Sequence, residues 1–324
     1  MCYNEYVEQK VINVPHKKRY HMIDLIREKE LIENRLDNLL YGSIEIRERN
    51  EHKYIYVNYR DDGIKRSKYA GVYSPELQNT IIGNNKLAKQ YKRRLREINK
   101  ILDELGYSES SLSEKIKLNI DVARKNIVDS IYKQARLEGI LTTYADTETI
   151  ITGGKVKNMH IYDVMKIVNL KRAWNFILNE FVITHPTDYN ILRQINGVVD
   201  DGFSYTAGQI RPVPVKIGGS TYLPPIPIET KVIEDINNIV NSSISVADKT
   251  VELLLYVTKS QIFIDGNKRT AVIFANHYLI SKGGGLIIIP EDLVGEYVKH
   301  LLNYYEDKND KIKNFLKEKC LMLF

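Results

Sequence analysis

The feature that most constrains the fold is a polar loop set between two segments of helical period. Residues 248–257 carry apolar side chains at Val251, Leu254 and Leu255, and residues 270–281 repeat this spacing. Such spacing is typical of amphipathic helices. Between the two segments lies the pentapeptide Asp-Gly-Asn-Lys-Arg at 265–269. The sequence therefore predicts a helix, a short polar loop and a second helix.

The loop has the composition of a phosphate site. Gly266 lets the backbone approach a ligand closely, and the first amides of the following helix are unpaired donors. Lys268 and Arg269 add two positive charges at the same helix end, which favours a polyphosphate. A carboxylate at Asp265 beside the phosphates is placed to hold Mg²⁺. An ordinary polar turn is the alternative interpretation, and Phe263 is expected to anchor the loop in the core.

The nine residues 261–269 read QIFIDGNKR and resemble the signature of the Fic family, H-x-F-x-[DE]-G-N-[GK]-R. Every fixed position matches except the first, where Gln261 replaces the histidine that is the family's general base. The resemblance implies a helical domain that binds ATP with Mg²⁺ and transfers AMP to a Ser, Thr or Tyr hydroxyl of a protein. It assigns the metal to Asp265 and the nucleotide phosphates to the next four residues, namely Gly266, Asn267, Lys268 and Arg269.

The glutamine changes what the resemblance implies about activity. A glutamine amide cannot act as a general base near neutrality, a role worth typically 10²- to 10⁴-fold in rate. We therefore expect a slow or inactive transferase. A nucleotide-sensing or interaction protein without transfer is one alternative. The other is transfer of phosphate, because Lys268 and the lack of a second arginine at Val272 resemble the related Doc proteins.

A second segment resembles a self-inhibitory motif of the family. Residues 134–143 read QARLEGILTT, similar to the helix-end pattern [ST]-x-x-x-E-[GN], with a glutamine in place of the Ser or Thr. The resemblance makes Glu138 and Gly139 inhibitory residues. The family's glutamate pairs with the second arginine, which is absent here, so Glu138 would need Arg269 or Lys268 as its partner. The alternative is a helix end capped by glycine with a solvated glutamate.

A third segment, residues 208–225, is predicted to form a β-hairpin. Its sequence GQIRPVPVKIGGSTYLPP alternates valines with polar or proline positions before a Gly-Gly turn. Prolines suit an exposed strand edge. The segment looks like the family's flap, which aligns a target protein by strand pairing, and the resemblance assigns the docking of that protein partner to Gly208, Arg211, Val213 and Val215. A surface hairpin without a role is the alternative.

The remaining pattern predicts a mainly α chain in two domains. The resemblance covers residues 115–324 and implies a Fic-type bundle there with an inhibitory helix at 119–139. The helical period predicts further helices at 163–180, 232–240, 293–302 and 310–323, with the flap as the only β-structure of this domain. Residues 1–110 form a separate module of two long helices, 17–40 and 75–105, which carry a β-hairpin between them. Ser74 and Pro75 predict the start of the second helix.

Positive charge gathers on the second long helix. Residues 86–100 contain seven Lys or Arg against one acid, Glu97. A solvated helix face is the commoner explanation of such a run. Nucleic acid is the alternative partner.

Composition fits a soluble protein of a reducing compartment. The chain has 324 residues, 43% hydrophobic and 27% charged, with a net charge of +6. Its two cysteines stand at opposite ends, so no disulfide framework is expected. No run of 18 apolar residues and no signal peptide is found. A bacterial, cytoplasmic protein without membrane contact is expected, and assembly with copies of itself is left open. The seven histidines show no metal-ligand spacing, and His277 is expected to be packed or solvated.

Overall fold

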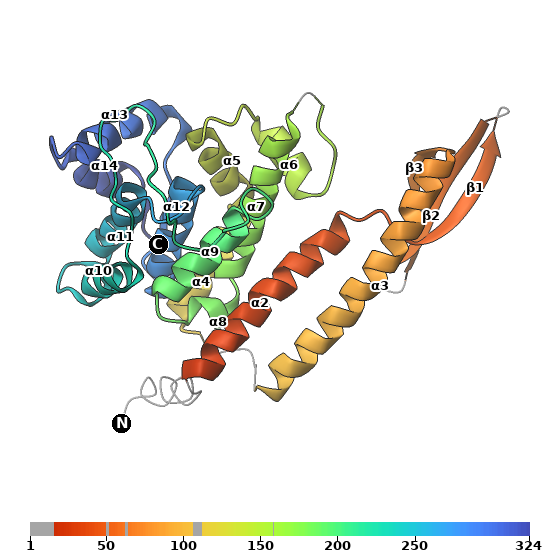
Figure 1. The fold of residues 1–324 in the computed structure, drawn as a ribbon, viewed down its shortest axis with the longest axis horizontal. Helices are drawn as coiled ribbons and strands as arrows, with labels where there is room; N and C mark the ends of the chain where they lie inside the picture. Colours follow the sequence, from red (N-terminus) through yellow and green to blue (C-terminus); the bar gives the residue numbers. More distant parts are fainter. Residues whose placement is uncertain (1–15, 50–51, 62–63, 106–111, 158) are drawn as a thin grey trace. The chain divides into compact units, whose positions relative to one another are not determined.

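The computed structural model describes residues 16–49, 52–61, 64–105, 112–157 and 159–324. The chain divides into two compact units (Figure 1). The smaller unit comprises Glu28–Tyr107, and the larger comprises Met1–Arg27 with Ser108–Phe324. The long helix α2 (His16–Asp37) contributes its first part to the larger unit and its second part to the smaller.

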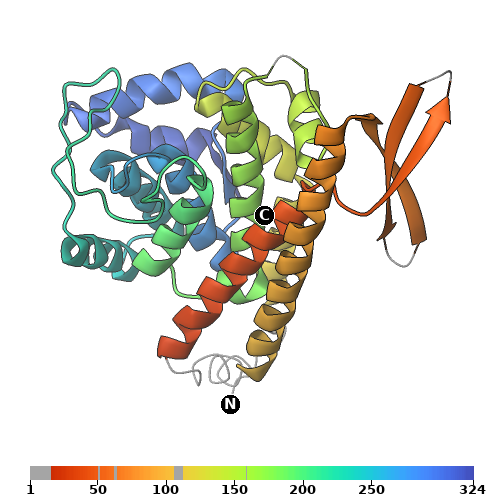
Figure 2. The same ribbon diagram turned by 45° about the vertical axis from the view of Figure 1, so that its right-hand side comes forward.

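The smaller unit is a three-stranded antiparallel meander followed by a long helix. Its elements are β1 (Ser43–Arg49), β2 (His52–Asp61), β3 (Ile64–Val72) and α3 (Pro75–Glu104). In the register, Ile46 faces Ile55 and Val57 faces Lys68. We predicted one hairpin in this region, but residues 43–61 form two paired strands instead of one. Figure 2 shows the three strands as orange arrows.

Alternation places the apolar residues of the sheet on one face. Ile55 and Val57 of β2 are buried together with Ile81 of α3, and the neighbouring Leu40, Ile44, Ala70, Tyr73 and Leu77 pack around them. Helix α3 begins as predicted, since the Leu77 amide donates to Ser74 Oγ at 3.1 Å and Pro75 occupies the first turn. Fully burying one such aliphatic side chain contributes about 1.5–3 kcal/mol.

The larger unit is a bundle of helices. They are α4 (Glu114–Lys125), α5 (Ile127–Leu137), α6 (Tyr144–Ile151), α7 (Ile161–Ile177), α8 (Glu180–Ile183), α9 (Tyr189–Val199), α10 (Glu229–Asn241), α11 (Val246–Ser260), α12 (Asn267–Ser281), the short 3₁₀ helix η1 (Glu291–Leu293), α13 (Val294–Tyr305) and α14 (Lys311–Lys319). The predicted mainly α fold is confirmed. The single helix predicted at 119–139 is instead formed by parts of α4 and α5, which meet at Asn126, and α5 ends at Leu137, just before Glu138.

Helix α12 is the centre of this bundle. It packs against α11, α9, α7, α4 and α8, and its side chains from Thr270 to Ile280 are buried without interruption. A helix that is buried on all sides belongs to the core rather than to the surface. The loop that precedes α12 is therefore attached to a helix of the core.

Two details of β-structure differ from the prediction. The described flap residues 208–225 contain no paired strands, although the Ser220 amide donates to Ile217 O at 3.2 Å and closes the expected turn. Pro212, Pro214, Pro224 and Pro225 have no amide hydrogen to donate to a ladder. The chain end was predicted to be helical to 323, but α14 stops at 319, and β5 (Leu321–Met322) pairs with β4 (Leu286–Ile287).

Among the described residues, none of the helices combines the length and the apolar character that crossing a membrane requires. Cys320 is a free, buried thiol whose pKa burial raises to about 12. Cys2, the other cysteine of the chain, lies outside the described residues.

Candidate functional site

The loop between α11 and α12 is held by two residues in the left-handed backbone region. Gln261, directly after α11, has φ of 46°, and Gly266, directly before α12, has φ of 75°. A Cβ atom on Gly266 would stand 3.1 Å from Val199 Cγ1 and 3.2 Å from Asn196 Nδ2. Only glycine combines this conformation with so close an approach to α9.

Asn267 shapes the loop from inside. Its Oδ1 accepts from the Phe263 amide at 3.0 Å, and its Nδ2 donates to Phe263 O at 2.8 Å. Phe263 is buried, as predicted. The Asn267 side chain is thus engaged within the loop, which leaves its backbone amide for the predicted phosphate contact. The first hydrogen bond of α12 runs from the Thr270 amide to Gly266 O, so the amides of 267–269 precede the helical ladder.

Both ends of the Gln261 amide contact the loop and its neighbouring helix. Its Nε2 donates to Thr258 O at 2.7 Å, and its Oε1 accepts from Asn267 Nδ2 at 3.3 Å. At the position of the family's general base, the Gln261 side chain therefore links the end of α11 to Asn267 by hydrogen bonds.

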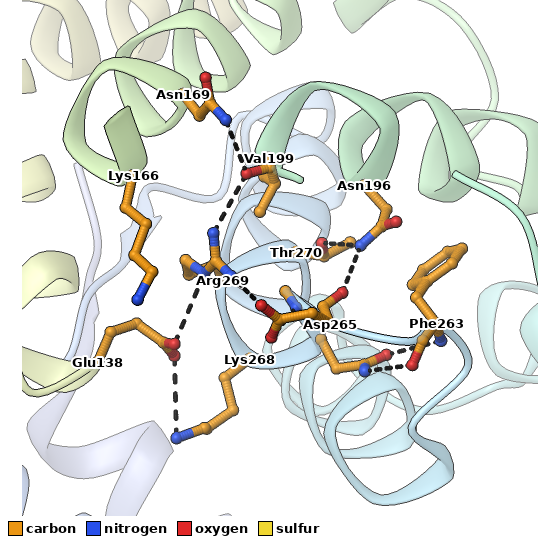
Figure 3. A network of polar contacts seen from close by, with 12 residues as sticks. Glu138, Lys166, Asn169, Asn196, Val199, Phe263, Asp265, Lys268, Arg269 and Thr270 are labelled. Carbon is orange, nitrogen blue, oxygen red and sulfur yellow. Dashed lines mark hydrogen bonds and ion pairs between the residues drawn. The ribbon is translucent and has the colours of Figure 1, made fainter. Parts of the chain in front are cut away.

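Arg269 joins the loop to two other elements (Figure 3). Its side chain is 1% exposed. One terminal nitrogen donates to Val199 O at 3.2 Å, the other lies 3.2 Å from Asp265 Oδ2, and Nε lies 3.5 Å from Glu138 Oε2. A buried guanidinium requires such anionic and carbonyl partners, because an uncompensated buried charge is costly.

Glu138 and Gly139 lie at the end of α5, facing the loop. Gly139 has φ of 78° and terminates the helix. The Glu138 side chain is 14% exposed, and its carboxylate lies 3.5 Å from Arg269 Nε and 3.9 Å from Lys268 Nζ. Both cations named from the sequence are thus its neighbours, and the glutamate is not solvated. Within the described residues, neither Glu138 Oε1 nor Arg269 Nε forms a hydrogen bond, so Glu138 contacts the two cations through ion pairs only.

The central bridging residue, Asn196 of α9, was missed from the sequence. It is fully buried. Its Nδ2 donates to Asp265 O at 3.0 Å and to Thr270 Oγ1 at 3.1 Å, while its Oδ1 accepts from the Gly208 amide at 2.8 Å. One side chain thus connects the loop, α12 and the start of the flap. Nothing distinguishes it in the sequence from other asparagines of an amphipathic helix.

Gln134 was noted only as a departure from the inhibitory pattern, yet it links α5 to α12. Its Nε2 donates to Arg269 O at 2.8 Å, and its Oε1 accepts from Trp174 Nε1 at 3.2 Å. These bonds hold the end of α5, and with it Glu138, against the loop.

Asp200, also missed, is a buried carboxyl group at the end of α9. Burial raises its pKa to about 6, the neighbouring Asp265 charge acts in the same direction, and Arg269 opposes both. Its Oδ1 accepts no hydrogen bond from the described residues. Together with Glu138, Asp200 and Asp265 bring the carboxyl groups near the Arg269 guanidinium to three.

The predicted docking residues of the flap divide into two kinds. Gly208 is buried with φ of 75°, and a Cβ there would stand 2.6 Å from Arg193 O. Arg211 is also fully buried: it donates to Val213 O and Pro225 O, both at 2.6 Å, and to the Gln261 carbonyl oxygen. Arg211 thus fastens the flap to the loop and is not exposed for a target. Val213 is 46% exposed and Val215 is half-buried.

Asp265 suits a weakly ligated cation. Its side chain is 59% exposed, although Oδ1 accepts from the Gly266 amide at 2.6 Å. No group of three or more His, Cys, Asp or Glu side chains able to hold a metal occurs within the described ranges. Mg²⁺ usually takes one or two carboxylates together with phosphate oxygens and waters, and this single exposed carboxylate fits that pattern.

A cavity of ≈ 880 Å³ lies beside the base of the flap, away from the loop. Thr187, Tyr189, Arg193 and Gly208 are among its lining residues, and residues 261–269 are not. His277 lies buried nearby, between Thr187 Oγ1 at 2.8 Å and Val182 O at 2.9 Å, and burial lowers its pKa to about 4. His277 is therefore packed in the core and not solvated, which is one of the two alternatives expected from the sequence.

Comparison with known proteins agrees with this geometry. Residues 186–279 match the model of the Fic/DOC family. This segment of the chain is similar to the Fic/DOC family. The matched range includes α9, the flap, the loop and most of α12, and it excludes Glu138 and the smaller unit.

Solved structures of Fic proteins share the fold of this chain at low identity. A substituted fragment of Fic-1 from C. elegans is 16% identical, with a TM-score of 0.51 over 76% of this chain and 74% of that one. A Fic-domain signaling protein from Bacteroides thetaiotaomicron is 17% identical, with a TM-score of 0.51 over 64% and 86%. A Fic family protein from Desulfovibrio desulfuricans is 13% identical, with a TM-score of 0.51 over 64% and 72%. Among curated proteins, none matches significantly.

Proposed function

We propose that this Fic domain binds ATP with Mg²⁺ at the loop of residues 261–269 and transfers AMP to a protein hydroxyl at a rate that Gln261 keeps low. The observation that carries the proposal is the start of α12, where Lys268 and the buried Arg269 stand beside the first helical amides and next to Asp265. The two cations and the first amides of the helix are groups that can bind a polyphosphate.

Each residue of the site has a distinct part in binding. Lys268, whose side chain is 44% exposed, and Arg269 would contact phosphates. Asp265 would hold Mg²⁺, which when bound supplies positive charge to the phosphates. Val213 and Val215 of the flap would contact the target protein, while Arg211 keeps the flap attached to the loop.

The step expected to limit the rate is removal of the proton from the target hydroxyl. Gln261 has no proton acceptor of suitable pKa, and general base catalysis is worth typically 10²- to 10⁴-fold. Positioning and charge stabilisation supply most of the catalysis in phosphoryl-type transfer, and the residues for both remain. We therefore expect a transferase that works slowly.

Glu138 would oppose nucleotide binding. Its carboxylate lies 3.5 Å from Arg269 and 3.9 Å from Lys268, the two cations that phosphates require. Negative phosphate groups and this carboxylate compete for the same charges. The domain is therefore proposed to be self-inhibited through the first arginine of the motif, since Val272 provides no second one.

A second candidate function is nucleotide binding without transfer. It is favoured by Gln261, because both polar atoms of its side-chain amide form hydrogen bonds, one to Thr258 and one to Asn267. Phosphate transfer of the Doc type is the variant favoured by Lys268 and by the buried Val272.

Intact-mass analysis of the full chain after incubation with ATP and Mg²⁺ separates these functions, because addition of AMP, addition of phosphate and no addition give different masses. Calorimetric titration measures binding in parallel. Lys268→Ala should weaken ATP binding, while Lys299→Ala, on the exposed surface of α13, should not. Absence of binding at millimolar ATP in wild type, Arg269→Ala and Glu138→Gly alike would rule out the phosphate site.

A further inference from the structure

Positive charge is concentrated in one part of the smaller unit. Residues 41–100 contain 14 Lys and Arg against 7 Asp and Glu, whereas the whole chain contains 47 against 41. The remainder of the chain thus has 33 against 34 and is close to neutral. The net charge of the protein lies in the strands and in α3, and a polyanion would be attracted there.

A groove of ≈ 720 Å³ opens within this basic region. It lies between the strands and α3 and is lined by Tyr41, Gly42, Ser43, Asn58, Tyr59, Lys65, Asn85 and Lys92. Two aromatic rings, two ammonium groups and three small polar side chains make up nearly all of its wall. The wall contains no carboxylate, and the neighbouring Glu45 is bound to Arg47 and Asn58.

Hydrogen bonds between α3 and the segment before β1 fix the shape of the groove. Asn85 of α3 accepts from the Gly42 amide at 2.8 Å and donates to Gly42 O at 3.0 Å, and Asn84 donates to Leu40 O at 3.0 Å. Gly42 has φ of 146°, and a Cβ there would stand 2.4 Å from Asn58 O. These contacts fix the backbone on both sides of Tyr41.

Aromatic rings and cations both line the groove. Lys92 Nζ lies 4.7 Å from the centre of the Tyr41 ring, and the Tyr59 side chain, which also lines the groove, is 37% exposed. Within the described part of the chain, Lys65 and Lys92 form no ion pair with an acid, whereas Arg93 and Arg94 do, with Glu97 and Glu28.

Helix α3 extends the groove in one direction. Asn85, Lys89, Lys92 and Arg96 follow one another at intervals of four, three and four residues, which places them on one helix face. Lys89, Lys92 and Arg96 are exposed. A solvated helix face would explain the charge of α3 alone. It would not explain a fixed groove in which the same face meets two tyrosines.

We infer that the smaller unit binds single-stranded nucleic acid in this groove, with bases against Tyr59 and Tyr41 and phosphates on Lys65, Lys92 and the α3 face beyond them. Binding of single strands typically combines a basic groove with aromatic side chains on which bases stack. The asparagine and serine side chains of the wall suit hydrogen bonds to base edges. This activity is independent of the function proposed for the Fic domain.

Fluorescence anisotropy with the full chain and labelled 20-nucleotide DNA and RNA strands tests the inference. Tyr59→Leu should weaken binding about 5- to 150-fold, the equivalent of one lost base stack. Lys65→Gln with Lys92→Gln should lower the slope of log Kd against log salt by about 1.4, since each phosphate contact on a single strand contributes about 0.7.

The control is Lys125→Gln with Lys299→Gln, which removes the same charge from exposed positions of the larger unit and should leave both Kd and slope unchanged. Equal loss in this control would mean attraction by net charge and would overturn the inference. So would absence of binding at low salt, binding that Tyr59→Leu leaves unchanged, or a duplex of the same sequence that binds more tightly than the single strand.

Discussion

Replacing Glu138 by glutamine removes one negative charge from the phosphate site and preserves the shape of the side chain. The carboxylate is 14% exposed and lies 3.5 Å from Arg269 Nε and 3.9 Å from Lys268 Nζ. Arg269 keeps Asp265 Oδ2 and Val199 O, each at 3.2 Å, so it does not become an unpaired buried charge. The substitution removes only the carboxylate that Lys268 and Arg269 share, so less negative charge opposes the binding of phosphate.

The size of the effect follows from the kind of contact. Hydrogen bonds to charged groups contribute about 1.5–3 kcal/mol, but Glu138 and Arg269 form an ion pair without a hydrogen bond. We therefore expect about 1–2 kcal/mol, which corresponds to a decrease of about 5- to 30-fold in the Kd for ATP with Mg²⁺. The gain should be smaller for AMP, which has fewer phosphate charges to compete with the carboxylate.

Isothermal titration calorimetry of wild type and Glu138→Gln with ATP and with AMP measures this difference. Glu318→Gln, at an exposed position of α14, removes the same charge elsewhere and should match wild type. Identical ATP affinities of wild type and Glu138→Gln would refute the reasoning and leave Glu138 as a residue that only ends α5.

Three further predictions concern the loop and its supports. Gln261→His should raise auto-modification by labelled ATP on the order of 10²-fold or more, while Gln261→Ala should not; silence of the histidine variant with ATP bound would favour the non-transferring function. Asn196→Ala should lower the free energy of unfolding by about 2–4 kcal/mol, because it leaves buried partners in the loop and flap unsatisfied; a loss below about 1 kcal/mol in urea denaturation would contradict this. For His277, whose pKa burial lowers from 6.5 to about 4, the unfolded chain takes up a proton below pH 6.5 that the folded chain refuses until about pH 4. Stability should therefore fall by about 1 kcal/mol between pH 7.5 and 5.5 from this group, and urea denaturation of His277→Gln should show a correspondingly flatter dependence.

Local sequence was sufficient for the elements with strong periodic or capping signals. The helices on both sides of the loop, the start of α3 at Ser74 and the buried Phe263 agree with expectation, because period, caps and turn residues act over a few positions. The motif also indicated that Glu138 would meet Lys268 or Arg269. The strands predicted for the flap are absent from the described structure of residues 208–225, since the hydrogen bonds of a ladder need amides that its prolines lack.

Only the tertiary structure determined the contacts between residues far apart in the chain. Asn196 reaches Asp265, Thr270 and Gly208, and Gln134 reaches Arg269, through bonds that no local pattern encodes. The resemblance assigned Arg211 to the docking of a target protein, yet the structure buries its side chain against four carbonyl groups. Periodicity and motifs determine which residues face inward or form a turn. Which buried donor meets which acceptor depends on how the helices pack, and that is a property of the whole fold.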